Sequence, residues 1–154
     1  MTDDASISER PPAVMTASWL LIVGAVLLMA GGLLTATVGF DTLRQTAPPT
    51  VSDAAVRDSL WLYRGVGALF ALAAVALTGM AVRTRGGDLR FRRATMALGL
   101  AIVVLVALAA VFTGAVFILA LLSTVPIVVG VMMLNRPAVS AWFAGVEYGR
   151  DTDG

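Results

Sequence analysis

The chain has 154 residues, of which 58% are hydrophobic and 14% are charged, with a net charge of +1. This is too apolar for an ordinary soluble domain, in which about a quarter of the residues are charged, and nothing in the charge indicates a nucleic-acid partner. Neither Cys nor His occurs. A disulfide, a thiolate nucleophile, a histidine proton shuttle and a Cys- or His-ligated metal centre are therefore excluded for this chain alone.

The first 16 residues form a polar, acidic segment that we predict to be a disordered cytoplasmic tail. Its acidic residues outnumber its single arginine, Arg10, which is the wrong balance for the start of a signal peptide. The apolar run that follows extends from about 17 to 40. Because about 20 helical residues cross a hydrocarbon core of about 30 Å, this run predicts the first membrane span.

The second predicted span covers residues 59–82 and contains one charge, Arg64. The segment 41–58 before it reads as a loop, and two adjacent prolines there would break any continuing helix. The segment 83–93 after it holds five arginines and one aspartate, and two adjacent glycines mark a turn between helix ends.

The third and fourth predicted spans follow from the absence of charge between residues 94 and 134. As a single helix this segment would be about 60 Å long, twice the thickness of the hydrocarbon core. We therefore predict two spans, 94–112 and 115–134, joined by a hairpin whose tip is Thr113-Gly114.

Two further features of the spans concern helix packing. Small residues recur four apart at Gly32 and Ala36, Gly67 and Ala71, Ala97 and Ala101, and Ala110 and Gly114. Such pairs let helices approach closely in lipid, and they can serve the bundle itself or a partner. Pro126 is expected to kink the fourth span, with Thr124 helping to satisfy the freed backbone groups.

The last segment, 135–154, has a different character. Pro137 suits the first turn of a new helix. The apolar residues Val139, Trp142, Phe143 and Val146 fall at positions i, i+3, i+4 and i+7. They predict a short amphipathic helix lying in the headgroup region; the alternative is a frayed tail whose spacing is accidental.

The sequence thus predicts an all-α protein, a four-transmembrane-helix bundle with a short C-terminal amphipathic interfacial helix. With four spans, the N-terminal tail, the 83–93 loop and the C-terminal segment share one side and hold eight of the eleven arginines. Because basic residues concentrate in cytoplasmic loops, we expect both termini in the cytoplasm and the chain in the plasma (cytoplasmic) membrane.

Arg64 is the one ionisable residue inside a predicted span, which makes it a candidate functional residue. It lies about five residues, or about 7 Å, into the helix. At that depth it can snorkel to the outer headgroups or pair with Asp41 or Asp58. The alternative is a contact with a partner subunit or an anionic lipid.

The other candidate contact residues lie on the cytoplasmic side. Arg90, Arg92 and Arg93 either bind anionic headgroups or only set the topology. Trp142 and Phe143 of the tail helix are candidates for a lipid or partner contact. No catalytic, cofactor-binding or metal-binding residue is predicted, since no Asp, Glu or His lies within a span and no phosphate-binding loop motif is present.

Three stretches, LYRGVGALFALA, RTRGGDLRFRRA and NRPAVSAWF, resemble the small uncharacterised four-span integral membrane proteins of actinobacteria. The resemblance implies a cell-envelope setting, in which such proteins often accompany larger transport or respiratory assemblies. It implies no role for any single residue.

The main functional hypothesis is a non-catalytic accessory or stabilising subunit of a larger cell-envelope membrane complex, and not an enzyme. The first alternative is a small transporter, channel or lipid-binding module that acts as a homo-oligomer. The second is a membrane enzyme with a poorly polar site. The expected partners are membrane lipids and other membrane protein subunits, without nucleic acid, and no cofactor is expected.

Overall fold

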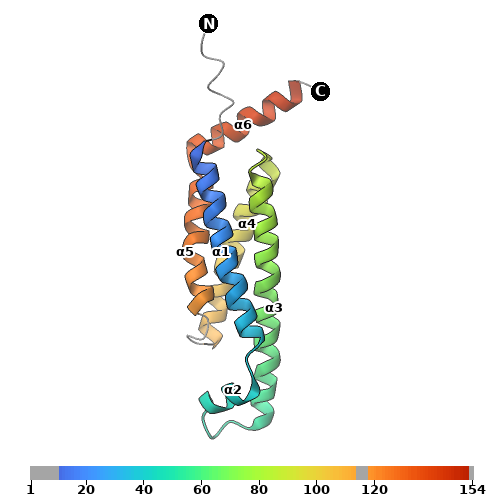
Figure 1. Ribbon diagram of the computed structural model, residues 1–154, viewed down its shortest axis with the longest axis vertical. Helices are drawn as coiled ribbons and strands as arrows, with labels where there is room; N and C mark the ends of the chain where they lie inside the picture. Colours follow the sequence, from blue (N-terminus) through green and yellow to red (C-terminus); the bar gives the residue numbers. More distant parts are fainter. Residues whose placement is uncertain (1–10, 114–117, 153–154) are drawn as a thin grey trace.

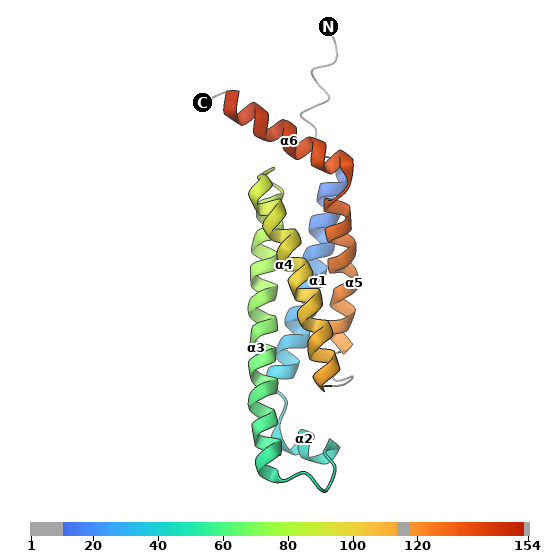
Figure 2. The same cartoon turned by 180° about the vertical axis from the view of Figure 1, so that it is seen from behind.

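The computed structural model describes residues 11–113 and 118–152, which form six helices. These are α1 (Pro12–Ala36), α2 (Phe40–Thr46), α3 (Asp53–Thr84), α4 (Leu89–Thr113), α5 (Ile118–Leu134) and α6 (Pro137–Thr152). Helices α1, α3, α4 and α5 run side by side, α2 lies beyond one end of them, and α6 crosses the other end (Figures 1 and 2). The predicted all-α helical bundle is therefore confirmed for the described residues.

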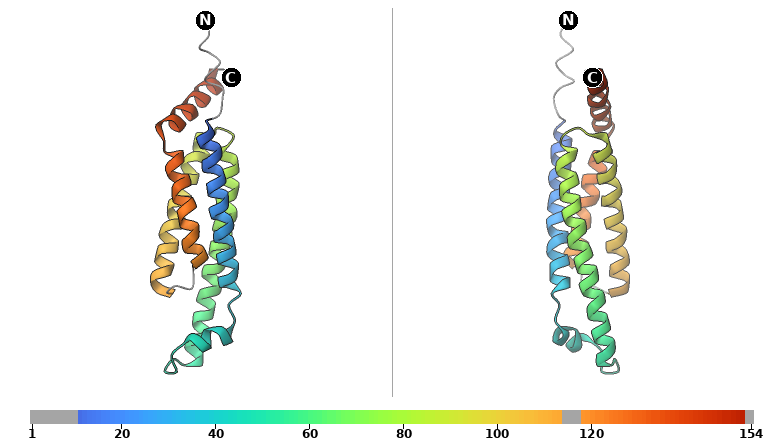
Figure 3. Two further views of the ribbon diagram at one scale, coloured as in Figure 1. Left: turned by 60° about the vertical axis from the view of Figure 1, so that its left-hand side comes forward. Right: turned by 90° about the vertical axis from the view of Figure 1, so that its right-hand side faces the viewer.

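Helix α1 lies between α3 and α5 and packs extensively on both, and α4 packs on α3 and α5 (Figure 3). The largest fully buried side chains include Leu21, Leu28, Phe70, Leu77, Ile102 and Ile127. They come from all four long helices, so one continuous apolar core joins the bundle.

The contact between α1 and α3 depends on glycine. A Cβ atom built on Gly67 would lie 2.5 Å from the backbone oxygen of Gly32 and 2.5 Å from the backbone nitrogen of Ala36. A Cβ atom on Gly32 would lie 3.0 Å from the backbone nitrogen of Ala71. The first two small-residue pairs of the sequence therefore pack against each other inside the bundle.

The contact between α1 and α5 also uses glycine, at positions that the four-residue pattern did not single out. A Cβ atom on Gly31 would lie 3.0 Å from the backbone nitrogen of Ala120, and one on Gly130 would lie 3.1 Å from the backbone oxygen of Ala17. The two helices approach closely near both of their ends, as expected where small residues let helix backbones meet.

Of the two remaining small-residue pairs, the third has no such role and the fourth lies partly outside the described residues. Ala97 and Ala101 are exposed on the outside of α4. Gly114, the partner of Ala110 and part of the expected hairpin tip, lies outside the described residues.

Helices α1 and α3 start before the predicted spans, and α1 ends at Ala36, short of the predicted end near residue 40. Helix α1 starts at Pro12, so residues 12–16 are helical rather than part of a disordered tail; residues 1–10 lie outside the described part. Helix α3 starts at Asp53 because the Ser52 hydroxyl caps it, accepting a hydrogen bond from the Ala55 N–H (3.3 Å). The predicted loop 41–58 thus contains α2 and the start of α3.

The α3–α4 turn and the proline of α5 test two local expectations. The turn falls at the two adjacent glycines, and Gly87 has a φ of 77°, which favours glycine. Pro126 lies inside α5 and removes the hydrogen bond to the Leu122 carbonyl. The Thr124 hydroxyl instead donates to the Leu121 oxygen (2.6 Å), so the expected compensation by Thr124 is not present.

Three helices, α1, α3 and α4, are long and apolar enough to cross a membrane. Helix α5 has 17 residues and meets α6 at a bend of 59°. By length and composition the described chain has three crossing helices, or four if this bent pair forms one span.

Candidate contact sites at the two ends of the bundle

One end of the bundle gathers the start of α1, the α3–α4 turn and the α5–α6 junction (Figure 1). Six arginines belong to these segments, namely Arg83, Arg85, Arg90, Arg92, Arg93 and Arg136. We call this the arginine end and the opposite one, which carries α2, the α2 end.

Arg92 is the most enclosed of these arginines, with 8% of its surface exposed. Its Nε atom donates to the backbone oxygen of Leu134 (3.1 Å), and its Nη2 atom donates to the Ser140 hydroxyl (2.6 Å). Its guanidinium lies 5.4 Å from the centre of the Phe143 ring, within cation–π range. Arg92 therefore links α4 to the end of α5 and to α6. It has a structural role in addition to any part in setting the membrane topology.

The apolar face of α6 packs on the bundle. Val139 and Phe143 are fully buried and belong to the main core. Trp142 is half-buried and meets Phe143 edge to face, with ring centres 4.9 Å apart. These side chains therefore pack mainly on the bundle, and α6 offers less apolar surface to lipid than a free interfacial helix would. The side chain of Val146 lies outside the described part.

Arg85 forms a second connection, between α3 and the start of α1. Its Nε atom donates to the Ser18 hydroxyl (2.7 Å), which donates in turn to the backbone oxygen of Ala81 (3.0 Å). The guanidinium lies 5.0 Å from the centre of the Trp19 ring. Its Nη2 atom is buried and has no hydrogen-bond partner among the described residues. Ser18 is thus the relay that holds Arg85 against α1.

Ser18→Ala is expected to lower the free energy of unfolding by about 1–2 kcal/mol, because it leaves the Arg85 Nε group without its acceptor. Thr16→Ala is the matched control, since the Thr16 hydroxyl is exposed and bonds only to its own helix, at Pro12. Unfolding of both variants in mixed micelles would measure the difference. Equal stability of the two variants would show that the hydrogen bond between Arg85 and Ser18 does not contribute to the free energy of unfolding.

The remaining arginines of this end are exposed, and they have different surroundings. Arg83 stacks on Phe91 at 5.2 Å. Arg90 and Arg93 point outward from the first turns of α4, and Arg136 is exposed at the α5–α6 junction. Of the three arginines predicted to meet headgroups, the structure leaves Arg90 and Arg93 accessible and encloses Arg92.

Arg64 is exposed on α3 at the other end of the bundle. It comes three residues before Gly67, which packs against Ala36, the last residue of α1. Arg64 therefore lies about 4.5 Å beyond the level at which α1 ends, at the edge of the bundle. No ion pair joins it to Asp41 or Asp58 in the described structure, where both carboxylates are exposed.

The α2 end is organised by a different arginine, Arg44. Its Nη1 atom donates to the Val51 oxygen (2.8 Å), and its Nε atom lies 3.2 Å from a carboxylate oxygen of Asp53. Asp53 is exposed and the Arg44 side chain is 34% exposed, so water screens the ion pair and it adds little stability. It fixes the path of the loop between α2 and α3.

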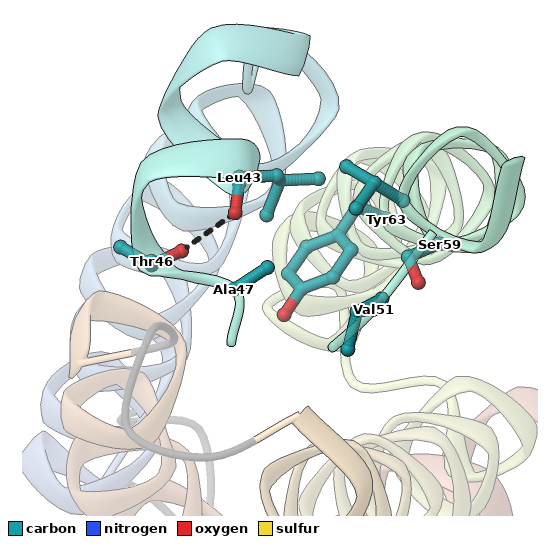
Figure 4. Close-up of a pocket in the computed structure, with 7 residues that line it drawn as sticks. Leu43, Thr46, Ala47, Val51, Ser59 and Tyr63 are labelled. Carbon is teal, nitrogen blue, oxygen red and sulfur yellow. Dashed lines mark hydrogen bonds between the residues drawn. The ribbon is translucent and has the colours of Figure 1, made fainter. Parts of the chain in front are cut away.

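A pocket of about 250 Å³ lies between α2, this loop and α3 (Figure 4). Tyr63 points into it from α3, opposite Leu43 and Ala47. The hydroxyls at its edge, Thr46 and Ser59, donate to backbone oxygens of their own helices. The pocket therefore offers few free donors, and it holds none of the candidate residues named from the sequence.

Sequence reasoning missed the contacts whose partners are distant in the chain. Ser18 and Arg85 are 67 positions apart, and Arg92 and Ser140 are 48 apart. The available signal was a hydroxyl residue, Ser18, at the start of an apolar run. In the described residues no cluster of acidic side chains that could hold a metal ion is found.

These features define the chain as an all-α helical bundle with the long apolar helices expected of a multi-pass membrane protein. No protein-family model matches the chain, and no match is found among the curated proteins or the solved structures.

Proposed function

We propose that the protein is a non-catalytic accessory subunit of a larger cell-envelope membrane complex, with four spans and both termini in the cytoplasm. The transport or respiratory nature of that complex rests on the family resemblance alone. The proposal is supported by an outward face of α3 on which no other described part of the chain packs.

The fourth span is supported by the position of α5. Its contacts with α1 extend from Gly130 at Ala17 to Ala120 at Gly31. If α1 crosses a membrane, α5 lies beside it through about 20 Å of that path. Helix α6, which bends away and buries its apolar face on the bundle, then remains on the arginine side.

The outward face of α3 carries the functional proposal. Gly65, Ala68, Leu72, Val75, Gly79 and Val82 follow one another at spacings of three and four residues, and all are exposed. This alternation is the spacing with which one helix packs along another. A Cβ built on Gly65 or Gly79 would meet no neighbouring helix within 4 Å, so neither glycine is needed for packing among the described helices.

Glycine inside a helix costs about 1 kcal/mol relative to alanine. Elsewhere in this bundle the close approach of a neighbouring helix accounts for it, as at Gly31, Gly67 and Gly130. At Gly65 and Gly79 the close approach of a helix from another protein would explain the glycine in the same way, because small residues let helices meet in lipid.

The test is affinity purification in mild detergent, followed by mass spectrometry of the proteins recovered. The wild type should bring down other membrane proteins. Gly65→Leu/Gly79→Leu should lower that recovery by about tenfold or more, because each new side chain occupies the contact. Ala101→Leu/Ala107→Leu, which changes exposed small residues of α4, should not.

Three other outcomes would contradict either the accessory-subunit role or the contact at the α3 face. A wild type recovered alone would remove the accessory-subunit role. Recovery only with further copies of itself would favour the homo-oligomeric transporter, channel or lipid-binding module instead. Equal losses in the α3 and α4 variants would mean that the α3 face is not the contact.

A further inference from the structure

A groove of about 180 Å³ runs between α4 and α5 on the outside of the bundle. Every side chain that lines it is apolar: Leu100 and Val103 lie on α4, and Val128, Val131 and Met132 lie on α5. Gly99 lets the helices approach, since a Cβ there would lie 2.8 Å from Val131. The groove has no polar group that could hold a polar ligand.

Two exposed polar side chains stand in line with the groove toward the arginine end. Arg93 precedes Leu100 by seven residues, so it lies on the same face of α4 about 10 Å away along the axis. Asn135 follows Val128 by seven residues, and its N–H still bonds to the Val131 oxygen (3.2 Å), which keeps it on the same face of α5. Both are exposed.

Among the described residues, the positive charges at the mouth of the groove have no acidic partner. Arg92 crosses from α4 to the Leu134 oxygen there. Arg93 is the next residue of α4, Arg136 comes two residues after Leu134, and both are exposed. None of the three forms an ion pair among the described residues. The ion pair found there, between Arg44 and Asp53, lies at the α2 end. The first turn of α6 starts at the same point, and the N-terminal end of a helix favours an anion.

A positive mouth above an apolar groove matches one kind of molecule in a membrane. We propose that an anionic phospholipid of the leaflet at the arginine end binds between α4 and α5, with its phosphate at Arg93 and Arg136 and one acyl chain in the groove. Arg92 holds the walls of the mouth together and adds to its charge. Arg90 lies a turn farther from the groove and takes no part. This site is independent of the α3 face and does not rest on the accessory-subunit role.

The headgroup contact can be tested by native mass spectrometry of the full chain in detergent, with dioleoyl phosphatidylglycerol and dioleoyl phosphatidylcholine added in turn. One phosphatidylglycerol should be retained in preference to phosphatidylcholine. Arg93→Gln and Arg136→Gln should each weaken that preference about fivefold, and the double variant about 25-fold. Arg83→Gln/Arg90→Gln removes the same charge at the same end and should keep the preference. Equal losses in the two double variants would show general attraction to the arginine end and overturn the site.

The contact between the lipid's acyl chain and the groove is tested with a separate set of variants. Leu100→Trp fills the groove and should weaken retention of phosphatidylglycerol. Ala101→Trp, a change at an exposed residue at the same depth on another side of α4, should not. Dihexanoyl phosphatidylglycerol, with chains too short to fill the groove, should be retained more weakly than the dioleoyl form. Retention unaffected by both Leu100→Trp and chain length would exclude the groove as the binding site. Thermal unfolding of every variant would verify that the bundle is intact.

Discussion

Gly67→Ala is expected to lower the free energy of unfolding by about 2 kcal/mol or more, whereas Gly65→Ala, two residues earlier in the same helix, is expected to be neutral or stabilising by up to about 1 kcal/mol. The two substitutions add the same methyl group to α3. They differ only in the direction in which that group points.

The opposite signs follow from the surroundings of the two positions. At Gly67 the methyl group would meet backbone atoms of α1 at 2.5 Å, and backbone cannot rotate away as a side chain can. Relief therefore requires α1 and α3 to separate along a contact that also includes the buried residue Phe70. At Gly65 nothing lies within 4 Å, so alanine brings only its higher helix propensity.

The measurement is reversible unfolding in mixed detergent and dodecyl sulfate micelles, followed by circular dichroism. Gly32→Ala should behave like Gly67→Ala, because a Cβ there would lie 2.7 Å from the Gly67 oxygen. Equal effects of Gly67→Ala and Gly65→Ala would contradict the α1–α3 contact described above. A loss confined to Gly65→Ala would reverse the assignment of the inner and outer faces of α3.

The existence of the long helices could be predicted because length and charge alone determine it. A run of 41 uncharged residues from 94 to 134 exceeds what one crossing helix can contain. The helical segments beyond the apolar runs, such as α2 and the first turns of α3, were missed because hydropathy does not detect them. Their start depends on a cap, the Ser52 hydroxyl, which has a weak signal in sequence.

The pairing of helix faces was beyond sequence reasoning for a physical reason. Small residues recur so often that Gly32, Gly67 and Ala97 look alike in the sequence. Gly32 and Gly67 face each other, whereas Ala97 faces outward. Which of these occurs depends on the order of the helices around the bundle. In an apolar chain the lipid-facing and core-facing sides have similar hydrophobicity, so periodicity carries little information.

The candidate site was predicted only as a region. Counting charges placed Arg90, Arg92 and Arg93 together at one end, which the helix arrangement bears out. The charge count gave no reason to expect Arg92 to be enclosed while Arg90 and Arg93 are exposed. That difference arises because α6 folds over the end of the bundle and brings Ser140 and Phe143 to Arg92, a contact between segments far apart in the chain.

Arg92→Met is expected to lower the free energy of unfolding by about 2 kcal/mol and to loosen α6. Methionine keeps most of the apolar volume but loses the hydrogen bonds to Leu134 and Ser140. The Leu134 oxygen, at the end of α5, then loses its side-chain donor, and a bond from a charged donor contributes about 1.5–3 kcal/mol. Relief from burying the cation offsets part of that loss, which is why we expect less than the sum of two such bonds.

Arg90→Met is the matched control, because Arg90 is an exposed arginine two residues away on the same helix. Hydrogen exchange of residues 138–144 should become about tenfold faster in Arg92→Met and stay unchanged in Arg90→Met, since local opening responds by a factor of ten for each 1.4 kcal/mol. The fluorescence of Trp142, which packs on Phe143, should shift in the same variant. If instead α6 were held by its apolar face alone, Val139 and Phe143 would keep it in place, and both variants would exchange like the wild type.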